Sequence, residues 1–508
     1  MQRILVGRGP LTEAEVVAVA RAGAGVSLAS DAVEAITESR KIVESLAHDV
    51  EPHYGISTGF GALATTTIPQ DRRADLQRSL IRSHAAGSGP EVEREVVRAM
   101  MLLRLSTLAT GRTGVRPETA AALCFLLDEG ITPVVPEFGS LGCSGDLAPL
   151  AHVALALMGE GPVRDASGLL RPAADVVRPI ELIEKEGLAL INGTDGMLGQ
   201  LLLACTDLDQ LLRTVDVSAA MSVEAMLGTD RVFAADIAAL RPQPGLVVAA
   251  ANMRALLAGS PIIASHAGPD CTYVQDAYSL RCAPQVAGAA RDTLTHARMV
   301  AGHELAAAID NPVVTLDGRV ESNGNFHGAP LGYVLDFLAI AVADLASMSE
   351  RRTDRMLDVA RSRGLPPFLA DEPGVDSGHM IAQYTQAALV SDLKRLAVPA
   401  SVDSIPSSAM QEDHVSMGWS AARKLRRALE GLTRVLAIEL LTAARALDLR
   451  APLAPGPATG AVRDALRSSV EGPAPDRFLA PEIDAAVTFV SSGAAVAAAD
   501  DALAEPLR

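Results

Sequence analysis

The amino-acid sequence predicts an all-α fold. Apolar residues make up 49% of its 508 residues but aromatic residues only 3%, so a large core has to be built from Ala, Leu and Val. Ala and Leu are among the strongest helix formers. Apolar side chains also recur in steps of four and three at positions 334, 338, 341, 345 and 348. This is the stripe of an amphipathic helix, which we expect to continue to about Arg355.

Charge and cysteine content restrict the class of protein. The net charge is −17 and no basic block occurs, which argues against nucleic acid or an anionic membrane surface as a partner. The first residues hold no apolar run of the length that a signal peptide needs, and no stretch reaches the ~18 uninterrupted apolar residues of a membrane span. The five cysteines, at positions 124, 143, 205, 271 and 282, lack a Cys-x-x-Cys spacing. We therefore expect a reduced, cytoplasmic protein without a disulfide framework or a zinc site.

The chain begins with helices and then reaches a glycine-rich loop. Residues 12–15 fit a capping box that opens a helix reaching Ala22, and a second helix is expected over residues 31–47. The loop 53–61 carries Tyr54 and three glycines. Phosphate binding is disfavoured in this loop because neither Gly-Lys-Ser/Thr nor Gly-x-Gly-x-x-Gly occurs. Taken alone, Tyr54 would be an aromatic side chain that anchors the loop.

Helical patterning resumes at Asp71 and ends at His84, just before a glycine. A histidine at a helix end is often a simple C-terminal cap that the helix dipole favours. Two apolar helices are then expected over residues 96–108 and 119–127.

A stretch of small residues follows the breaks at Pro133 and Pro136. Residues 139–149 read Gly-Ser-Leu-Gly-Cys-Ser-Gly-Asp-Leu-Ala-Pro, and the glycines allow a tight backbone. By itself the stretch could be an ordinary Gly/Ser turn that enters a helix near Asp146.

Two later segments also mark turns. Residues 184–193 end in Asn192-Gly193, which alone would be a turn before a long helix over residues 197–215. Residues 254–274 are expected to be irregular because they contain Gly-Ser-Pro and Gly-Pro-Asp.

Residues 275–285 place a tyrosine and an arginine three positions apart. On a helix, Tyr278 and Arg281 would share one face. The arginine fork suits a carboxylate because its parallel N–H donors match the two oxygens. The alternatives are a packed tyrosine and a structural ion pair between Arg281 and Asp276.

Three short segments in the second half carry polar side chains. Residues 310–312 and 322–328 would each, alone, be ordinary Asn/Gly turns. Residues 410–418 contain Glu-Asp-His, which could be a metal cluster. We expect no metal site, because His-Glu-x-x-His does not occur and His303-Glu304 lacks a second histidine.

Helices are expected to continue to Leu449. Residues 451–476 are rich in Pro, Ala and Gly and are expected to form a loop. We find no internal repeat.

Together, these segments resemble the motifs of the aromatic amino acid ammonia-lyase and aminomutase family, in the same order, from about Leu11 to at least Phe489. The resemblance implies an all-α fold of the fumarase and aspartase type. It implies an N-terminal catalytic domain over residues 1–200, which bears the reactive loop. Residues 201–508 would form a central helix bundle and C-terminal helices. It also implies a homotetramer whose active sites draw residues from more than one subunit.

The resemblance further implies a cofactor made from the chain itself. In this family the residues matching Cys143, Ser144 and Gly145 cyclise with loss of two waters to 4-methylideneimidazol-5-one, an electrophile, and no external cofactor is needed. Ser144 would supply the reactive carbon and Gly145 an unhindered nitrogen. Most members have Ala in place of Cys143. Asp195 also departs from the Gln more usual in members that act on histidine.

The resemblance assigns roles to side chains far apart in the sequence. The implied catalytic residues are Tyr54, Ser144, Tyr278 and Glu412. The implied cofactor contacts are Asn192 and Phe326, and the implied substrate contacts are His84, Asn192, Gln275, Arg281, Asn311 and Glu412. Arg281 and Asn311 would hold the substrate carboxylate. A positioned base is needed for the weakly acidic β-proton, and the sequence leaves open whether it is Tyr54, Tyr278 or Glu412.

His84 and Glu412 favour imidazole over phenyl as the substrate ring. A buried carboxylate beside a benzene ring would be left without a hydrogen-bond donor, whereas imidazole can donate to it. We therefore expect elimination of ammonia from L-histidine to give trans-urocanate. The alternatives are a lyase or 2,3-aminomutase acting on tyrosine or phenylalanine, and a catalytically dead helical scaffold. The scaffold would be marked by loss of Ser144, Tyr54 or Tyr278, and all three are present.

Overall fold

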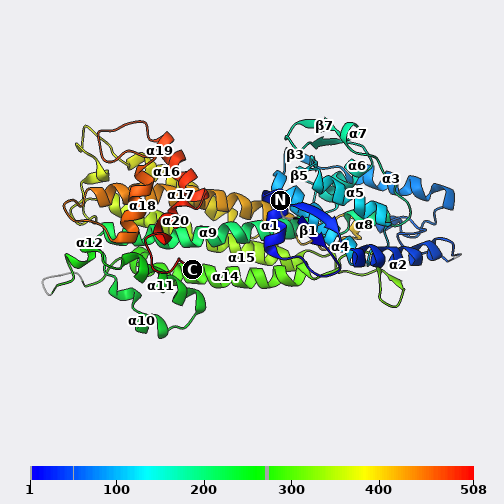
Figure 1. Cartoon of the computed structure of the whole chain (residues 1–508), viewed down its shortest axis with the longest axis horizontal. Coiled ribbons are helices and arrows are strands. Elements are labelled where there is room, and N and C mark those ends of the chain that lie inside the picture. The colour runs from blue at the N-terminus through cyan, green and yellow to red at the C-terminus, as the bar shows by residue number, and fades with distance from the viewer. Residues whose placement is uncertain (1–2, 50, 269–273) are drawn as a thin grey trace. The chain divides into compact units, whose positions relative to one another are not determined.

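The structure is a computed structural model that describes residues 3–49, 51–268 and 274–508, and most of these residues are helical (Figure 1). The predicted all-α fold is therefore confirmed. The chain forms two compact units. The first comprises Met1–Leu203, Arg298–Asp336 and Pro399–Arg423, and the second comprises Ala204–Ala297, Phe337–Val398 and Lys424–Arg508.

The first unit holds short N-terminal helices and small pieces of sheet. Its helices and 3₁₀ turns are α1 (Glu13–Arg21), α2 (Ser30–Ala47), η1 (Gly61–Leu63), η2 (Gln70–Arg72), α3 (Arg73–His84), α4 (Arg94–Ala109), α5 (Pro117–Asp128), α6 (Leu147–Leu157), α7 (Ala173–Val176), α8 (Glu186–Ile191) and η5 (Ser408–Met410). Its strands are β1 (Arg3–Val6), β2 (Gly25–Leu28), β3 (Ser88–Glu91), β4 (Thr132–Pro133), β5 (Pro136–Phe138), β6 (Pro162–Arg164), β7 (Leu170–Pro172), β8 (Val313–Val314) and β9 (Val320–Glu321). β1 and β2 pair in parallel, whereas β3–β5, β4–β6–β7 and β8–β9 are antiparallel. Strands of two to four residues are too short to form an independent sheet with its own hydrophobic core, so they only pair loop segments with one another.

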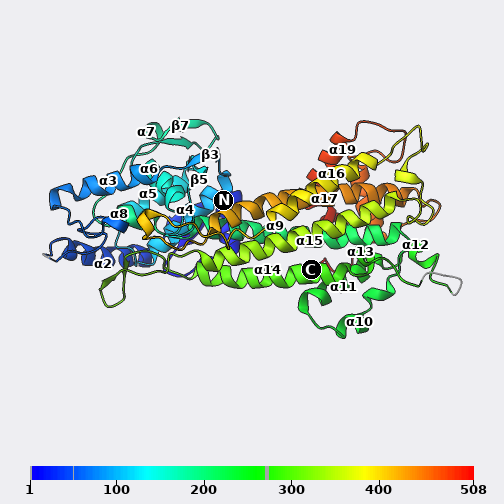
Figure 2. The ribbon, with the colours of Figure 1, turned by 180° about the vertical axis from the view of Figure 1, so that it is seen from behind.

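The second unit is helical throughout its described elements. These are η3 (Arg231–Phe233), α10 (Ala235–Ala239), α11 (Pro244–Leu257), α12 (Pro261–Ala264), α13 (Tyr278–Arg281), η4 (Pro367–Leu369), α16 (Met380–Leu396), α18 (Pro457–Arg467), α19 (Ala480–Ser491) and α20 (Ala494–Asp500). Four long helices contribute residues to both units: α9 (Asp195–Ala225), α14 (Ala283–Leu305), α15 (Ala329–Leu357) and α17 (Gly418–Asp448). Figures 1 and 2 show α14 and α15 side by side.

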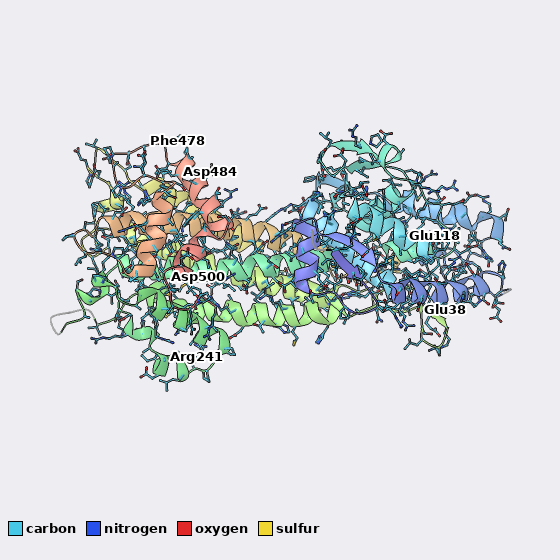
Figure 3. The ribbon with its side chains drawn as sticks, in the orientation of Figure 1. Glu38, Glu118, Arg241, Phe478, Asp484 and Asp500 are labelled. Atoms are coloured by element: carbon cyan, nitrogen blue, oxygen red, sulfur yellow. The ribbon has the colours of Figure 1, made fainter. Side chains whose placement is uncertain are left out.

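Local sequence accounts for several helix starts and buried faces. The Thr12 hydroxyl accepts from the Glu15 amide and the Glu15 carboxylate accepts from the Thr12 amide, which is the predicted capping box of α1. On α2, Val43 is fully buried on one face, whereas Glu38 lies on the exposed face. Glu38 on α2 and Glu118 on α5, both labelled in Figure 3, are exposed. This division into two faces is what an amphipathic helix requires.

Two of the expected loops are wrong in part. α11 and α12 occupy much of residues 254–268, where we expected irregular structure, and the rest of that expectation, residues 269–273, lies outside the described residues. The Ser260 hydroxyl accepts from the Ile263 amide and so caps α12. The loop expected over residues 451–476 contains α18. Pro457 stands at its first turn, where a proline is compatible with a helix, so proline content misled the prediction.

Glu186–Ala225 and Ala329–Leu357 are long and apolar enough by composition to cross a membrane; the apolar stretch is fully buried inside the chain in the first and 61% buried in the second. Among the described residues, no three His, Cys, Asp or Glu side chains are grouped as metal ligands. The four described cysteines form no disulfide, and Cys271 lies outside the described part of the chain.

The boundary expected near residue 200 stays a prediction. A compact unit ends its first segment at Leu203, but that unit also includes two later segments of the chain. A domain is a part that can fold alone, and compactness within one chain does not test this property.

Candidate active site

The first unit contains a cavity of about 1120 Å³. Segments from distant parts of the sequence line it. Of the side chains that the sequence singled out, it brings together Tyr54, His84, Cys143, Ser144, Asn192, Asn311, Phe326 and Glu412.

The Cys-Ser-Gly turn crosses one wall of this cavity immediately before α6. Gly145 has φ +76°, and a Cβ built there would lie 2.2 Å from the carbonyl oxygen of Gly193. The Asp146 amide donates to that same carbonyl at 2.8 Å. Gly145 is therefore required both by its left-handed backbone and by the close approach of the Gly193 segment.

Asp146 holds the turn to the start of α9. Its carboxylate is fully buried and accepts from the Ser140 hydroxyl at 2.8 Å and from the Met197 amide at 2.9 Å. Burial raises the pKa of Asp146 to about 7, while these two donors act in the opposite direction. The stretch does enter a helix at Asp146, and the buried carboxylate also joins it to Ser140 and to the start of α9.

A second anchor lies on the other side of the turn. The carbonyl of Gly142 accepts from the Ser416 hydroxyl at 2.6 Å and from the Gly328 amide at 3.1 Å. The Met417 amide donates to Leu141 at 2.9 Å. The segments that resemble the family loops around residues 326 and 416 thus pack on the backbone that leads into Cys-Ser-Gly.

Glu412 faces the turn directly. Its carboxylate accepts from the Ser144 hydroxyl at 3.2 Å and from the Cys143 thiol at 3.2 Å. Burial, followed by the nearby charge of Glu412, raises the pKa of the Cys143 thiol to about 12. Cys143 therefore stays a protonated thiol at neutral pH, which is the unreactive form.

Replacing Cys143 by alanine should leave most of the turnover intact. Only the backbone of Cys143 would enter the cyclised group, and its protonated thiol is a poor nucleophile. The measurement is kcat for purified Cys143→Ala beside the unmodified protein. A loss beyond roughly a hundredfold, the scale of a missing acid or base, would show that the thiol takes part in the chemistry.

Tyr54 and His84 approach the cavity from two other segments. The Tyr54 hydroxyl accepts from the Gly61 amide at 3.3 Å, and burial raises the pKa of Tyr54 above its ordinary value, so it holds its proton at neutral pH. His84 ends α3, and its Nδ1 lies 2.9 Å from the carbonyl oxygen of Leu80. When Nδ1 donates there, Nε2 of the neutral ring is an acceptor, and burial lowers the pKa of His84. His84 therefore both caps its helix and lines the cavity.

Two asparagines meet beneath the cavity. Asn192 Nδ2 donates to the carbonyl oxygen of Asn311 at 3.1 Å. Asn311 Oδ1 accepts from the Ser322 hydroxyl and the Asn323 amide, each at 3.0 Å. Asn192 Oδ1 is buried and has no hydrogen-bond partner among the described residues. An unsatisfied buried oxygen that lines a cavity indicates a group that can donate to it.

Arg104 is a supporting residue that the sequence analysis missed. It is buried on α4 and donates to the carbonyl oxygens of Asn192 at 3.0 Å and Ile309 at 3.0 Å, and it pairs with Asp195 at 3.2 Å. Asp195 therefore supplies a counter-charge for this arginine. Two arginines, Arg98 and Arg104, interrupt the apolar run of residues 96–108 and were the available clue, because a charged side chain is rarely buried without polar partners.

Gln275, Tyr278 and Arg281 lie in the second unit and do not line the cavity of the first. Tyr278 is 69% exposed, and Arg281 lies over its ring at 4.7 Å, so the predicted shared helix face is present. The alternative ion pair with Asp276 is wrong, because Asp276 pairs with Arg363 at 2.8 Å.

The fold is helical, and one cavity gathers the Cys-Ser-Gly turn, Tyr54 and Glu412. The chain matches the model of the aromatic amino acid lyases over residues 11–468 and belongs to that family.

The chain is also similar to individual relatives over nearly its whole length. It is 63% identical to the histidine ammonia-lyase of Streptomyces avermitilis, covering 98% of this chain and 99% of that protein, and 62% identical to that of Streptomyces coelicolor, covering 100% of both. Among solved structures, a tyrosine aminomutase from Streptomyces globisporus superposes with a TM-score of 0.93 at 38% identity, with 100% of both chains covered. A histidine ammonia-lyase from Trypanosoma cruzi gives 0.90 at 38% identity, covering 99% of this chain and 96% of the other.

Proposed function

We propose that this chain is a histidine ammonia-lyase, which eliminates ammonia from L-histidine to give trans-urocanate, the first step of histidine degradation, in the cytoplasm. The observation that carries the proposal is that His84 and Glu412 share one cavity with the Cys-Ser-Gly turn. The 62–63% identity to relatives named histidine ammonia-lyase supports it independently.

The proposal includes cyclisation of Cys143, Ser144 and Gly145 to 4-methylideneimidazol-5-one. The turn suits this group because Gly145 carries no Cβ where the Gly193 carbonyl approaches. Asn192 and Phe326, which both line the cavity, would contact it. The group would supply an electrophile that makes the amine a better leaving group.

The side chains themselves select the ring and handle protons. The Glu412 carboxylate and His84 Nε2 are both acceptors, and imidazole donates one N–H when neutral and two when protonated. A phenyl ring donates none, so both acceptors would be left unpaired beside it. Tyr54 holds its proton at neutral pH and can give it as an acid. The sequence offers Tyr54, Tyr278 and Glu412 for removing the β-proton, and the protonated state of Tyr54 favours the other two.

A second copy of the chain is part of the proposal. Among the described residues that line the cavity, none is Arg or Lys, yet an amino-acid carboxylate needs a positive partner. Arg281 and the exposed Tyr278 would come from another subunit, together with Gln275, in a homotetramer. Asn311, which lines the cavity, would add a polar contact to the carboxylate.

Arg281→Lys should already lower kcat/KM strongly, by about a hundredfold, because a point charge cannot reproduce the two parallel hydrogen bonds of the guanidinium. The reaction rate on histidine measures this. Histamine, which has no carboxylate, should not react with the unmodified protein. Near-normal kinetics of Arg281→Lys would contradict the role.

Mixed oligomers test whether Arg281 acts across subunits. Ser144→Ala and Arg281→Ala chains should each be inactive alone. Co-expressed, they should regain part of the activity, because some cavities would then combine an intact Ser144 with an intact Arg281. No recovery in oligomers shown to contain both chains would place both residues in the same subunit's site.

Product analysis tests the proposed reaction itself. Incubation with L-histidine should yield the unsaturated acid and ammonium in equal amounts, detected by ultraviolet absorbance and an ammonium assay. The structural likeness to a tyrosine aminomutase favours one second candidate, a 2,3-aminomutase. A β-amino acid formed from L-tyrosine, without ammonium, would replace the lyase proposal by that candidate.

A further inference from the structure

We propose that Ser407 is a positioning residue, which keeps the Glu412 carboxylate directed at the substrate ring once the Cys-Ser-Gly turn has cyclised. This inference rests on the proposed function and concerns the same cavity. The Glu412 carboxylate accepts hydrogen bonds from three side chains: Ser144 at 3.2 Å, Cys143 at 3.2 Å and Ser407 at 3.1 Å.

Of these three donors, Ser407 is the hydroxyl that survives cyclisation. The proposed reaction expels the Ser144 hydroxyl as water, so that hydrogen bond cannot persist. The Cys143 thiol stays, but S–H is a weak donor. Cyclisation does not involve Ser407, and its hydrogen bond goes to Oε2, the oxygen that Ser144 does not contact. Ser407 thus becomes the main fixed donor to the Glu412 carboxylate.

The backbone places Ser407 opposite Glu412. The two residues pair across a tight loop, with the Ser407 amide donating to the Glu412 carbonyl at 3.0 Å. Further along, the Val415 amide donates to the Ser404 hydroxyl at 2.9 Å. We call residues 404–415 the Glu412 hairpin. Ser416, the next residue, donates its hydroxyl hydrogen bond to the Gly142 carbonyl of the turn. The C-terminal end of the hairpin is therefore held in place independently of the conformation of residues 408–410.

The tip of the Glu412 hairpin is strained and poorly packed. Ser408, Ala409 and Met410 have φ values of +52°, +53° and +67°, although none of them is glycine. All three are exposed, with Met410 66% exposed. A left-handed backbone in such residues persists only where neighbouring contacts determine it. The hydrogen bonds between Ser407 and Glu412 join the two strands of the hairpin next to this tip. The Ser407 hydroxyl should therefore affect the orientation of the Glu412 carboxylate.

Ser407→Ala should lower kcat/KM for L-histidine by about tenfold, the scale of one hydrogen bond to a charged group, and should leave the low rate on L-phenylalanine unchanged. The histidine-to-phenylalanine ratio should therefore fall. Ser407→Thr, which keeps the hydroxyl, should restore the ratio. The intact mass of Ser407→Ala should still be lower than that of its translated sequence by two waters, which shows that cyclisation is normal.

Binding of two unreactive acids gives a readout apart from turnover. Calorimetry with 3-(imidazol-4-yl)propanoate and 3-phenylpropanoate should show that Ser407→Ala weakens the first by about tenfold and leaves the second unchanged. Ser404→Ala is the matched control, because it removes a hydroxyl from the same hairpin that contacts the Val415 amide and not Glu412. If the alanine variant at 407 does not fold, Ser407→Cys, with its weaker donor, should give an intermediate loss.

Three results would overturn the inference. An unchanged substrate ratio in Ser407→Ala, in a protein that prefers histidine, contradicts positioning while the proposed function stands. An equal fall of the ratio in Ser404→Ala assigns the effect to the hairpin and not to the hydroxyl on Glu412. Full translated mass in Ser407→Ala would assign Ser407 to cyclisation instead. Failure of the proposed function is seen separately, in the unmodified protein, from a lack of preference for histidine or from a β-amino acid product.

Discussion

Ser144→Ala should yield a folded protein whose turnover falls by roughly 10³-fold or more, the scale of removing a central catalytic group. The change deletes one oxygen, which contacts Glu412 and lies at the cavity surface, so the packing around the turn should persist. Without that oxygen the β-carbon of residue 144 carries no hydroxyl that can leave as water, so the methylidene cannot form. The measurements are the rate on L-histidine, the thermal midpoint and the intact mass.

The mass distinguishes loss of cyclisation from loss of fold. Unmodified protein should be lighter than its translated sequence by two waters, after allowing for the initiator Met1, whereas Ser144→Ala should have its full translated mass. Cys143→Ala is the neighbouring control and should both cyclise and turn over. Normal mass together with full activity in the unmodified protein would refute the cofactor proposal.

Glu412→Gln should lower kcat/KM for L-histidine by about 10²-fold or more if Glu412 is also the base. The amide keeps the shape of the carboxylate but removes its charge and replaces one acceptor by a donor. That donor would then face the Ser407 hydroxyl or the Cys143 thiol, which donate to Glu412 in the native protein. Steady-state rates over a range of histidine concentrations separate the effects on kcat and KM.

Asp413→Asn is the matched control for Glu412→Gln. Asp413 also lines the cavity and is adjacent in sequence, so its replacement removes the same charge from the same segment. The Asp413 change should have much the smaller effect, because the hydrogen bonds from Cys143 and Ser144 go to Glu412. Equal losses in the two variants would show that the charge of the segment, and not the contacts of Glu412, matters.

Predictions that rest on adjacent residues agree well with the structure. The capping box at Thr12 and Glu15 is present, and His84 ends its helix, because a helix end depends on a few neighbours in sequence. The shared face of Tyr278 and Arg281 is present for the same reason. The family motifs also identify side chains that lie together in the cavity of the first unit. Neither the spacing of these motifs nor their order in the chain specifies that their side chains meet in one cavity.

Supporting contacts were not predictable, because they join segments far apart in sequence. Arg104 contacts Asn192 after α8, Asp195 at the start of α9, and Ile309. Nothing in the sequence near residue 104 indicates these partners. Ser407 could not be identified from the sequence, because its role depends on the backbone pairing that places it opposite Glu412. α18 was missed because Pro, Ala and Gly were counted as loop formers, whereas a proline at a first helical turn is favourable.

The most direct measurement of the central claim is kcat/KM of the unmodified protein for L-histidine, L-phenylalanine and L-tyrosine, determined side by side at one pH. We expect histidine to exceed both competitors by about 10⁴-fold, because a site built to accept a ring N–H rejects rings without one. If phenylalanine or tyrosine matches histidine, the histidine assignment is contradicted, whatever the intact mass shows about cyclisation of Ser144.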